Sequence, residues 1–155
     1  MIEGSTTFTN TISQLEATTA DTSWSGTKRF KHLAQVYDPV DMTDIKSATR
    51  KFILLPTGTR ALPSPSFLGQ EGEMTSVIQR FDLFIAYTQG KNALELFKVI
   101  IEDVDQIGRA LMKVANFNTG LERRIVDGYS IDLDDQGGVA LITIGVECRY
   151  TPSYT

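Results

Sequence analysis

Residues 76–114 read SVIQRFDLFIAYTQGKNALELFKVIIEDVDQIGRALMKV and hold the strongest structural pattern of the chain. In its first part, Ser76 to Thr88, apolar side chains alternate with mixed ones, which predicts a strand with one face toward a core. Gly90 ends the strand, and Asn92 followed three residues later by Glu95 resembles a capping box. Apolar residues then recur at spacings of three and four, so the sequence predicts a long amphipathic helix after the strand.

The helix predicted after Asn92 has two different sides. Its apolar stripe consists of Phe97, Ile100, Val104, Ile107, Leu111 and Val114. Its charged residues point away from that stripe and are Glu95, Lys98, Glu102, Asp105, Arg109 and Lys113. We expect the helix to lie on a sheet with its charged side toward water. The stripe is interpreted as core and not as a cofactor site, because nothing polar converges within it.

Two further strands are predicted after the helix, over Arg124 to Leu133 and Val139 to Tyr150. The acidic and glycine-rich residues 134–138 between them are typical of a hairpin turn. Every second residue of the last strand is apolar, and Cys148 falls on this core face. We therefore interpret the only cysteine of the chain as a buried, inert thiol.

The residues before Ser76 predict shorter elements. A weak helix is expected over Thr6 to Ala20, a loop over Asp21 to Gly26, and short irregular or helical pieces between Phe30 and Ile45. The apolar run from Lys51 to Leu55 predicts a buried strand, because a proline and a glycine bound it.

The segment from Thr57 to Thr75 is predicted to be a long loop or arm, since it holds two prolines and three glycines. Long loops inside compact domains are uncommon unless they have a function. This one also carries the apolar residues Leu62, Phe67, Leu68 and Met74. It is either an ordered flap over the core of its own domain or an arm that binds a partner.

Together these elements predict one α+β domain over residues 1–155. We expect a single, mostly antiparallel or mixed sheet of about four strands, with the long helix and the weaker N-terminal helix packed on it. The hydrophobic share of 41% and the charged share of 22% are ordinary for a globular domain, so we expect the chain to fold.

Charge and rare residues exclude several classes of function. The net charge is −4 and the acidic residues are scattered, which disfavours a nucleic-acid reader. The basic cluster of residues 28–32 is interpreted as a solvated face. With one cysteine and one histidine, the chain offers neither a disulfide nor a zinc site, and we predict no catalytic, metal or cofactor site.

The targeting signals that sequences can carry are also not found. No run of about 18 apolar residues occurs, and residues 1–11 do not combine a basic region with an apolar one. We expect a protein that is neither exported by a signal peptide nor inserted in a membrane, and the lone Cys148 fits a cytoplasmic origin.

The order of these elements resembles the tail terminator family of tailed bacteriophages, whose members cap the tail tube and join it to the head. The resemblance covers most of the chain. It rests on an apolar strand and turn (Phe52 to Gly58), an irregular insert, a long alternating strand (Val77 to Tyr87), an amphipathic helix (Ala93 to Ala115), the stretch Gly128, Tyr129, Ser130, Ile131 and Asp132, the acidic turn at Asp134 and Asp135, and a closing strand that ends at Tyr150.

The resemblance implies a structural virion protein of the tail and neck, assembled in the host cytoplasm as a homohexameric ring. Its partners would be the tail tube protein and a neck or head-completion protein, with DNA only as passing cargo and no membrane. We hypothesise that Leu62, Phe67 and Leu68 contact the tube or an adjacent subunit. A second hypothesis places four acidic residues in the lumen, where they would repel DNA phosphates: Glu71, Glu73, Asp134 and Asp135.

Two alternatives stay open at the level of sequence. The chain could be another connector of the virion, such as a neck or tail tube subunit. It could also belong to a different class, as a small ligand-binding domain or enzyme built around His32. The pattern favours a protein that works by presenting surfaces to other subunits, because the side chains that catalysis needs are missing.

Overall fold

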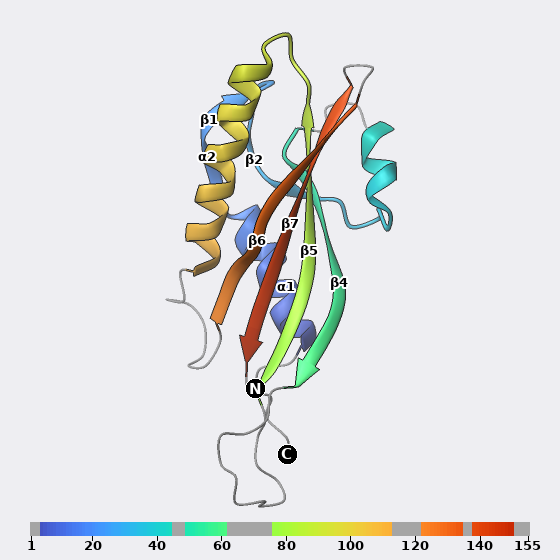
Figure 1. The fold of residues 1–155 in the computed structure, drawn as a ribbon, viewed down its shortest axis with the longest axis vertical. Helices are drawn as coiled ribbons and strands as arrows, with labels where there is room; N and C mark the ends of the chain where they lie inside the picture. Colours follow the sequence, from blue (N-terminus) through green and yellow to red (C-terminus); the bar gives the residue numbers. More distant parts are fainter. Residues whose placement is uncertain (1–3, 45–48, 62–75, 113–121, 135–137, 151–155) are drawn as a thin grey trace, which may run out of the picture.

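A computed structural model describes residues 4–44, 49–61, 76–112, 122–134 and 138–150. In these residues, five strands form one sheet in the order β3-β4-β5-β7-β6 (Figure 1). The strands are β3 (Lys31–His32), β4 (Lys51–Ala61), β5 (Val77–Thr88), β6 (Glu122–Leu133) and β7 (Val139–Tyr150). All neighbours in the sheet are antiparallel except the short β3, which pairs with β4 in parallel.

The centre of the sheet is the pair β5 and β7. These strands stay in register along their whole length, from Val77 opposite Tyr150 to Thr88 opposite Val139. Both strands were predicted from their alternating apolar residues, and the predicted bounds of β7 are confirmed. The predicted hairpin of β6 and β7 is also present, with β6 beginning two residues before the predicted Arg124.

Two α-helices lie on one face of the sheet in the described part of the chain: α1 (Gly4–Glu16) and α2 (Ala93–Met112) (Figure 1). The backbone amide of Glu95 donates to Asn92 Oδ1 at 3.3 Å, so the predicted cap of α2 is confirmed. α1 confirms the predicted N-terminal helix, but it ends at Glu16, and Thr19 and Ala20 of the predicted range belong to the strand Thr19–Trp24. Its weak helix-forming sequence is compensated by packing, because Leu15 is buried and Phe8 and Ile12 lie against the core.

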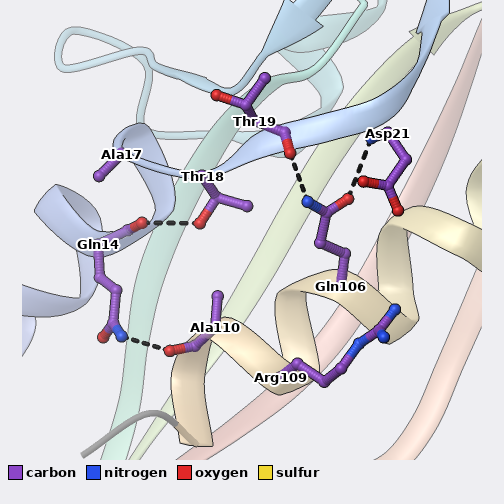
Figure 2. A pocket seen from close by; sticks show the side chains of 8 residues that line it. All are labelled: Gln14, Ala17, Thr18, Thr19, Asp21, Gln106, Arg109 and Ala110. Carbon is purple, nitrogen blue, oxygen red and sulfur yellow. Dashed lines mark hydrogen bonds between the residues drawn. The ribbon is translucent and has the colours of Figure 1, made fainter. Parts of the chain in front are cut away.

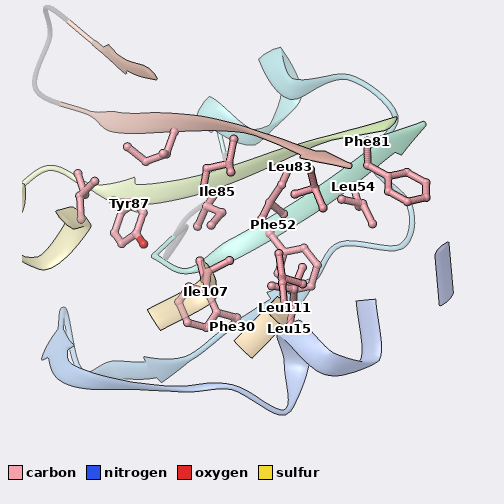
Figure 3. Close-up of a cluster of buried hydrophobic side chains, with 14 of the residues drawn as sticks. Leu15, Phe30, Phe52, Leu54, Phe81, Leu83, Ile85, Tyr87, Ile107 and Leu111 are labelled. Carbon is pink, nitrogen blue, oxygen red and sulfur yellow. The ribbon is translucent and has the colours of Figure 1, made fainter. Parts of the chain in front are cut away.

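The main core fills the space between these helices and the sheet. Figure 3 shows side chains from α1, β4, β5 and α2 converging there. The labelled members include Leu15, Phe52, Leu83, Ile85, Ile107 and Leu111. β7 adds the alternating residues that were predicted to face the core: Ala140, Ile142, Ile144, Val146, Cys148 and Tyr150.

The predicted fold class is confirmed, since the chain is α+β with a mostly antiparallel sheet, but the expected number of strands was too low. Besides the five-stranded sheet, the described residues form a two-stranded hairpin of β1 (Thr19–Trp24) and β2 (Thr27–Arg29). The predicted loop at Asp21 to Gly26 is therefore wrong. Ser25 and Gly26 both have positive φ angles, 50° and 75°, as in the tight turns that join hairpin strands.

β4 is longer than predicted and continues to Ala61, so the predicted loop does not begin at Thr57. A bulge between Pro56 and Gly58 shifts the register and lets the pairing with β5 resume. Gly58 has a φ of 146°, a backbone conformation that residues with a Cβ atom rarely adopt. The rest of the predicted loop, residues 62–75, lies outside the described residues.

The opposite face of the sheet is partly covered by the chain between β3 and β4. A 3₁₀ helix, η1 (Pro39–Asp44), lies there, on the other side of the sheet from α2 (Figure 1). Asp38 caps it, because its Oδ1 accepts a hydrogen bond from the Val40 amide at 3.0 Å. Short helical structure was predicted here. Met42 is fully buried in a second, smaller core with Ile53, Ala86 and Val139.

Candidate interaction surfaces

A buried polar cluster ties the helix layer to the sheet. Arg50, directly before β4, donates from Nε to Asp103 Oδ2 at 2.8 Å and from Nη2 to Oδ1 at 3.0 Å. The Tyr87 hydroxyl donates to the same Oδ2 at 2.5 Å. Arg50 Nη1 also donates to the carbonyl of Thr27 in β2. The guanidinium carbon lies 5.9 Å from the centre of the Phe30 ring.

This cluster corrects the prediction that nothing polar converges within the apolar stripe of α2. Asp103 lies on the buried side of the helix, with 1% of its surface exposed, and Arg50 is fully buried. Burial and the Asp103 carboxylate raise the pKa of Tyr87 well above its ordinary value. Because these groups are closed off from solvent and satisfy one another, the cluster is suited to holding the fold together and not to meeting a substrate.

Burial changes the acid–base character of both Cys148 and His32. The predicted burial of Cys148 is confirmed, and burial raises the pKa of its thiol to about 11, which disfavours the reactive thiolate. His32 is half-buried, with its ring 5.4 Å from that of Phe52, and burial lowers its pKa. At neutral pH, therefore, the thiol is protonated and the imidazole is mostly neutral.

A polar groove of about 470 Å³ lies where the end of α1 and the start of β1 meet α2 (Figure 2). Its amide side chains bind the backbone of neighbouring elements. Gln14 Nε2 donates to the Ala110 carbonyl. Gln106 Nε2 donates to the Thr19 carbonyl, and Gln106 Oε1 accepts a hydrogen bond from the Asp21 backbone amide. These hydrogen bonds connect α1 and β1 to α2. The polar side chains of the groove therefore stabilise the packing of these elements.

A more apolar hollow lies on the opposite face of the sheet, between η1 and the ends of β6 and β7 near their hairpin. We call it the far-face groove. It measures about 510 Å³ and is lined mainly by Val40, Phe84, Leu133 and Leu141, with Asp132 and Asp134 as its acidic members. Val40 is 67% exposed. Leu133 is 46% exposed and borders the hollow, but it pairs with Ala140 of the main core, so its side chain starts from the helix side of the sheet. Exposed apolar side chains that gather around a hollow are typical of a protein–protein contact site.

The solvent side of α2 carries a second exposed apolar feature, which we call the outer stripe. Its members are Leu94, Ile101 and Met112, which are 63%, 50% and 58% exposed. Residues of an α-helix are spaced by about 100°, so these three lie within about 20° of one line along the helix. The core residues of α2, such as Ile100 and Ile107, lie on the other side.

The described residues place few of the predicted site residues. Leu62, Phe67, Leu68, Glu71, Glu73 and Asp135 lie outside them. Asp134 is described and exposed at the start of the β6–β7 turn, where its carbonyl accepts a hydrogen bond from Gln89. Sequence analysis missed the outer stripe and the far-face groove. The recurrence of Leu94 and Ile101 at a spacing of seven was the available signal for the stripe.

A scan against known protein families finds no family that matches the chain, and a search of curated proteins finds no significant match. In the described ranges, no group of three or more His, Cys, Asp or Glu residues could hold a metal ion. None of the helices in these ranges has the length and apolar character needed to cross a membrane.

Proposed function

We propose that the protein is a structural subunit of a tailed bacteriophage virion, a tail terminator that assembles into a ring. The ring, with six copies as the resemblance implies, caps the tail tube, ends its polymerisation and joins the tail to the neck. Its partners are further copies of itself, the tail tube protein and a neck or head-completion protein. DNA passes through it as cargo.

One observation carries the proposal: exposed apolar residues gather on opposite sides of the molecule. The outer stripe lies on the helix side of the sheet, and the far-face groove lies on the other side. A subunit of a ring needs two different contact surfaces, one for each neighbour, because head-to-tail contacts join unlike patches. A monomeric enzyme has no need of either surface.

Two further findings support the proposal. The order of elements on which the resemblance rests recurs as β4, β5, α2, β6 and β7. The buried polar residues that could attract a catalytic reading, Arg50, Asp103 and Tyr87, satisfy one another inside the fold. A role built on surfaces is therefore the simpler account of this chain.

Electron microscopy of the purified protein tests the proposal and separates it from its nearest alternative. A terminator should give closed rings that do not grow with protein concentration, whereas a tail tube subunit should extend into filaments. Adding the rings to polymerising tube protein should stop tube growth. Rings that leave the tube length unchanged would contradict the terminator role, and filaments would favour a tube subunit.

A deletion of residues 63–72 tests the proposed contact of Leu62, Phe67 and Leu68 in the same assay. If these residues contact the tube, the shortened protein should still form rings but no longer limit tube length. If they contact an adjacent subunit, ring formation itself should fail. A shortened protein that forms rings and limits tube length normally would remove the loop from the proposal.

A further inference from the structure

Most of the exposed apolar surface lies on one side of the molecule, where α2 contacts the edge strand β6. Seven large apolar side chains are exposed in the described residues, and five of them belong to these two elements. The five are the members of the outer stripe, Leu94, Ile101 and Met112, together with Tyr129 and Leu133 of β6. Tyr129 pairs with Ile144 and Leu133 with Ala140, so both side chains start from the side of the sheet that carries α2.

The exposed residues of α2 and β6 lie at the same levels along the molecule. The two elements run in opposite directions (Figure 1), and Gly108 of the helix lies over Ile125 of the strand, since a Cβ atom at Gly108 would be 3.3 Å from Ile125 Cδ1. From Gly108 back to Leu94 the helix covers about 21 Å. From Ile125 on to Leu133 the strand covers about 20 Å, because the bulge in its middle takes up two residues. Leu94 and Leu133 therefore lie at the same end of one surface.

The apolar character continues around α2 from the outer stripe toward β6. Gly108, Phe97 and Val104 lie about 40°, 60° and 80° from the line of the stripe on that side, because helix residues are spaced by a constant angle. Phe97 and Val104 are partly buried and pack against the main core. We call the outer stripe, these two residues, Tyr129 and Leu133 the apolar flank.

The charged residues of α2 lie on the other side of the stripe, toward β1. Asp105 is nearest to the line of the stripe, at about 20°, and Lys98 follows at about 40°. Lys98 pairs with Glu95 at 3.6 Å, and Glu102 accepts a hydrogen bond from Thr22 of β1. The charges of α2 thus border the apolar flank and do not enter it.

The apolar flank is large enough for a specific protein contact. Its five exposed side chains offer about 500 Å² in total if a fully exposed large side chain has roughly 200 Å². The largest apolar patch of a soluble monomer is about 300 to 600 Å² and is often functional, and a standard interface buries about 800 Å² on each partner. With a polar rim added, the flank has the size that a stable contact needs. The bulge interrupts the open edge of β6, which disfavours the addition of a strand there, so we expect a helix to cover the flank.

The exposed side of α1 is the helical surface of this chain that fits the flank. It consists of small hydroxyl residues: Ser5, Thr6, Thr9 and Ser13. No residue from Ser5 to Gln14 is charged, although about a quarter to a third of surface residues usually are. The Thr9 hydroxyl donates to the carbonyls of Ser5 and Thr6, each at 3.1 Å, so it can be buried in a contact without losing these partners. Because serine and threonine form helices poorly, a contact with a neighbour would also stabilise α1.

We infer that the exposed side of α1 in one copy packs on the apolar flank of the next copy, with Thr9 against Ile101. α1 contacts β3 and α2 contacts β6, which are the two ends of the five-stranded sheet. The contact therefore joins unlike sides of successive copies, and repeated contacts can close a ring. This inference rests on the proposed ring and names the surfaces that build it. The far-face groove takes no part in the contact and stays open to the tube protein or the neck protein.

One glutamate on each surface tests the inference. Ile101→Glu places a charge in the flank and leaves α1 intact, whereas Thr9→Glu places a charge on α1 and leaves the flank intact. Both positions are exposed, so both variants should keep the circular dichroism of the wild type. Native mass spectrometry should find rings of the wild type and only monomers of each variant. Gln35→Glu adds the same charge at an exposed position outside both surfaces and should leave the rings intact.

Mixing the two variants shows which surfaces meet. The intact α1 of Ile101→Glu can pack on the intact flank of Thr9→Glu, so the mixture should form heterodimers that do not grow further. If the flank instead packed on the flank of another copy, Thr9→Glu alone would still associate. That result, or a mixture of the folded variants without heterodimers, would overturn the inference.

Failure of the inference and failure of the proposed function give different results. Rings that persist in either glutamate variant would overturn the contact between α1 and the flank and leave the proposed ring standing. A wild-type protein that stays monomeric at high concentration would instead contradict the proposed function itself.

Discussion

Replacing Arg50 with methionine should lower the free energy of unfolding by about 3 to 5 kcal/mol, among the largest effects of any single substitution in this chain. Methionine keeps much of the volume of the side chain but removes its charge. The Asp103 carboxylate would then stay buried with only the Tyr87 hydroxyl as a partner. Equilibrium unfolding in urea, followed by circular dichroism, measures this loss.

A matched triple variant shows that the effect comes from an uncompensated charge and not from lost packing. Arg50→Met, Asp103→Leu and Tyr87→Phe together replace the whole cluster with apolar groups of similar size. Such replacements are often neutral or stabilising, so the triple variant should recover most of the stability. Equal stability of Arg50→Met and the wild type would show that the ion pair does not hold α2 to the sheet.

The same cluster predicts a dependence on alkaline pH. The pKa of Tyr87 is raised in the folded state, so its contribution to stability is complete below about pH 10 and is lost as the pH rises above that value. Cys148, with its pKa raised to about 11, acts in the same direction. Tyr87→Phe should therefore lose less stability than the wild type above pH 10, and the difference between the two curves isolates Tyr87.

Ile100→Ala should lower the free energy of unfolding by about 2 to 5 kcal/mol, because Ile100 is fully buried in the main core. Its neighbour Ile101 provides a matched control with the same side chain in the same helix, but it lies about 100° further around the helix and is 50% exposed. Ile101→Ala should change the stability of the monomer by no more than about 0.5 kcal/mol. Thermal unfolding of both variants at low protein concentration makes the comparison.

This pair also links the fold to the proposed assembly. Ile101→Ala should weaken the ring while leaving the single chain stable, whereas Ile100→Ala should destabilise the chain itself. If Ile101→Ala unfolded as easily as Ile100→Ala in the monomer, Ile101 would belong to the core, and the outer stripe would lose its central residue as an interaction surface.

The elements predicted well are those with a strong apolar period. β5, β7 and α2 bury alternate or helically spaced residues, and burial forces that pattern into the sequence. β1 was missed because five of its six residues are exposed or half-exposed, and it is held by hydrogen bonds to side chains of α2 instead of by apolar alternation. β3, with two residues, is too short to show any period.

β4 was shortened for a different physical reason. Proline and glycine usually end a strand, and β4 contains both, at Pro56 and Gly58. Beyond Phe52, however, the described residues give β4 a strand partner on one side only. A proline fits such an edge, since its missing amide hydrogen is not needed there, and the bulge absorbs the glycine. Residues 56–60 are all exposed, so no apolar alternation marked the second half of the strand.

Only one partner of the buried ion pair, Asp103, could be predicted from the sequence. Asp103 follows Ile100 by three residues and precedes Ile107 by four, so its spacing places it on the core side of α2. Its partner Arg50 lies more than fifty residues earlier in a polar stretch, and nothing in one sequence pairs them. A charged residue at a core position of a helix is nevertheless a signal that a buried partner exists.

The mass of the native assembly is the decisive measurement, because the proposed function requires the chain to bind copies of itself. Native mass spectrometry or light scattering at micromolar concentration should find one closed species near six times the 17.2 kDa of the chain. A chain that remains a 17.2 kDa monomer up to the highest soluble concentration could not be a subunit of such a ring.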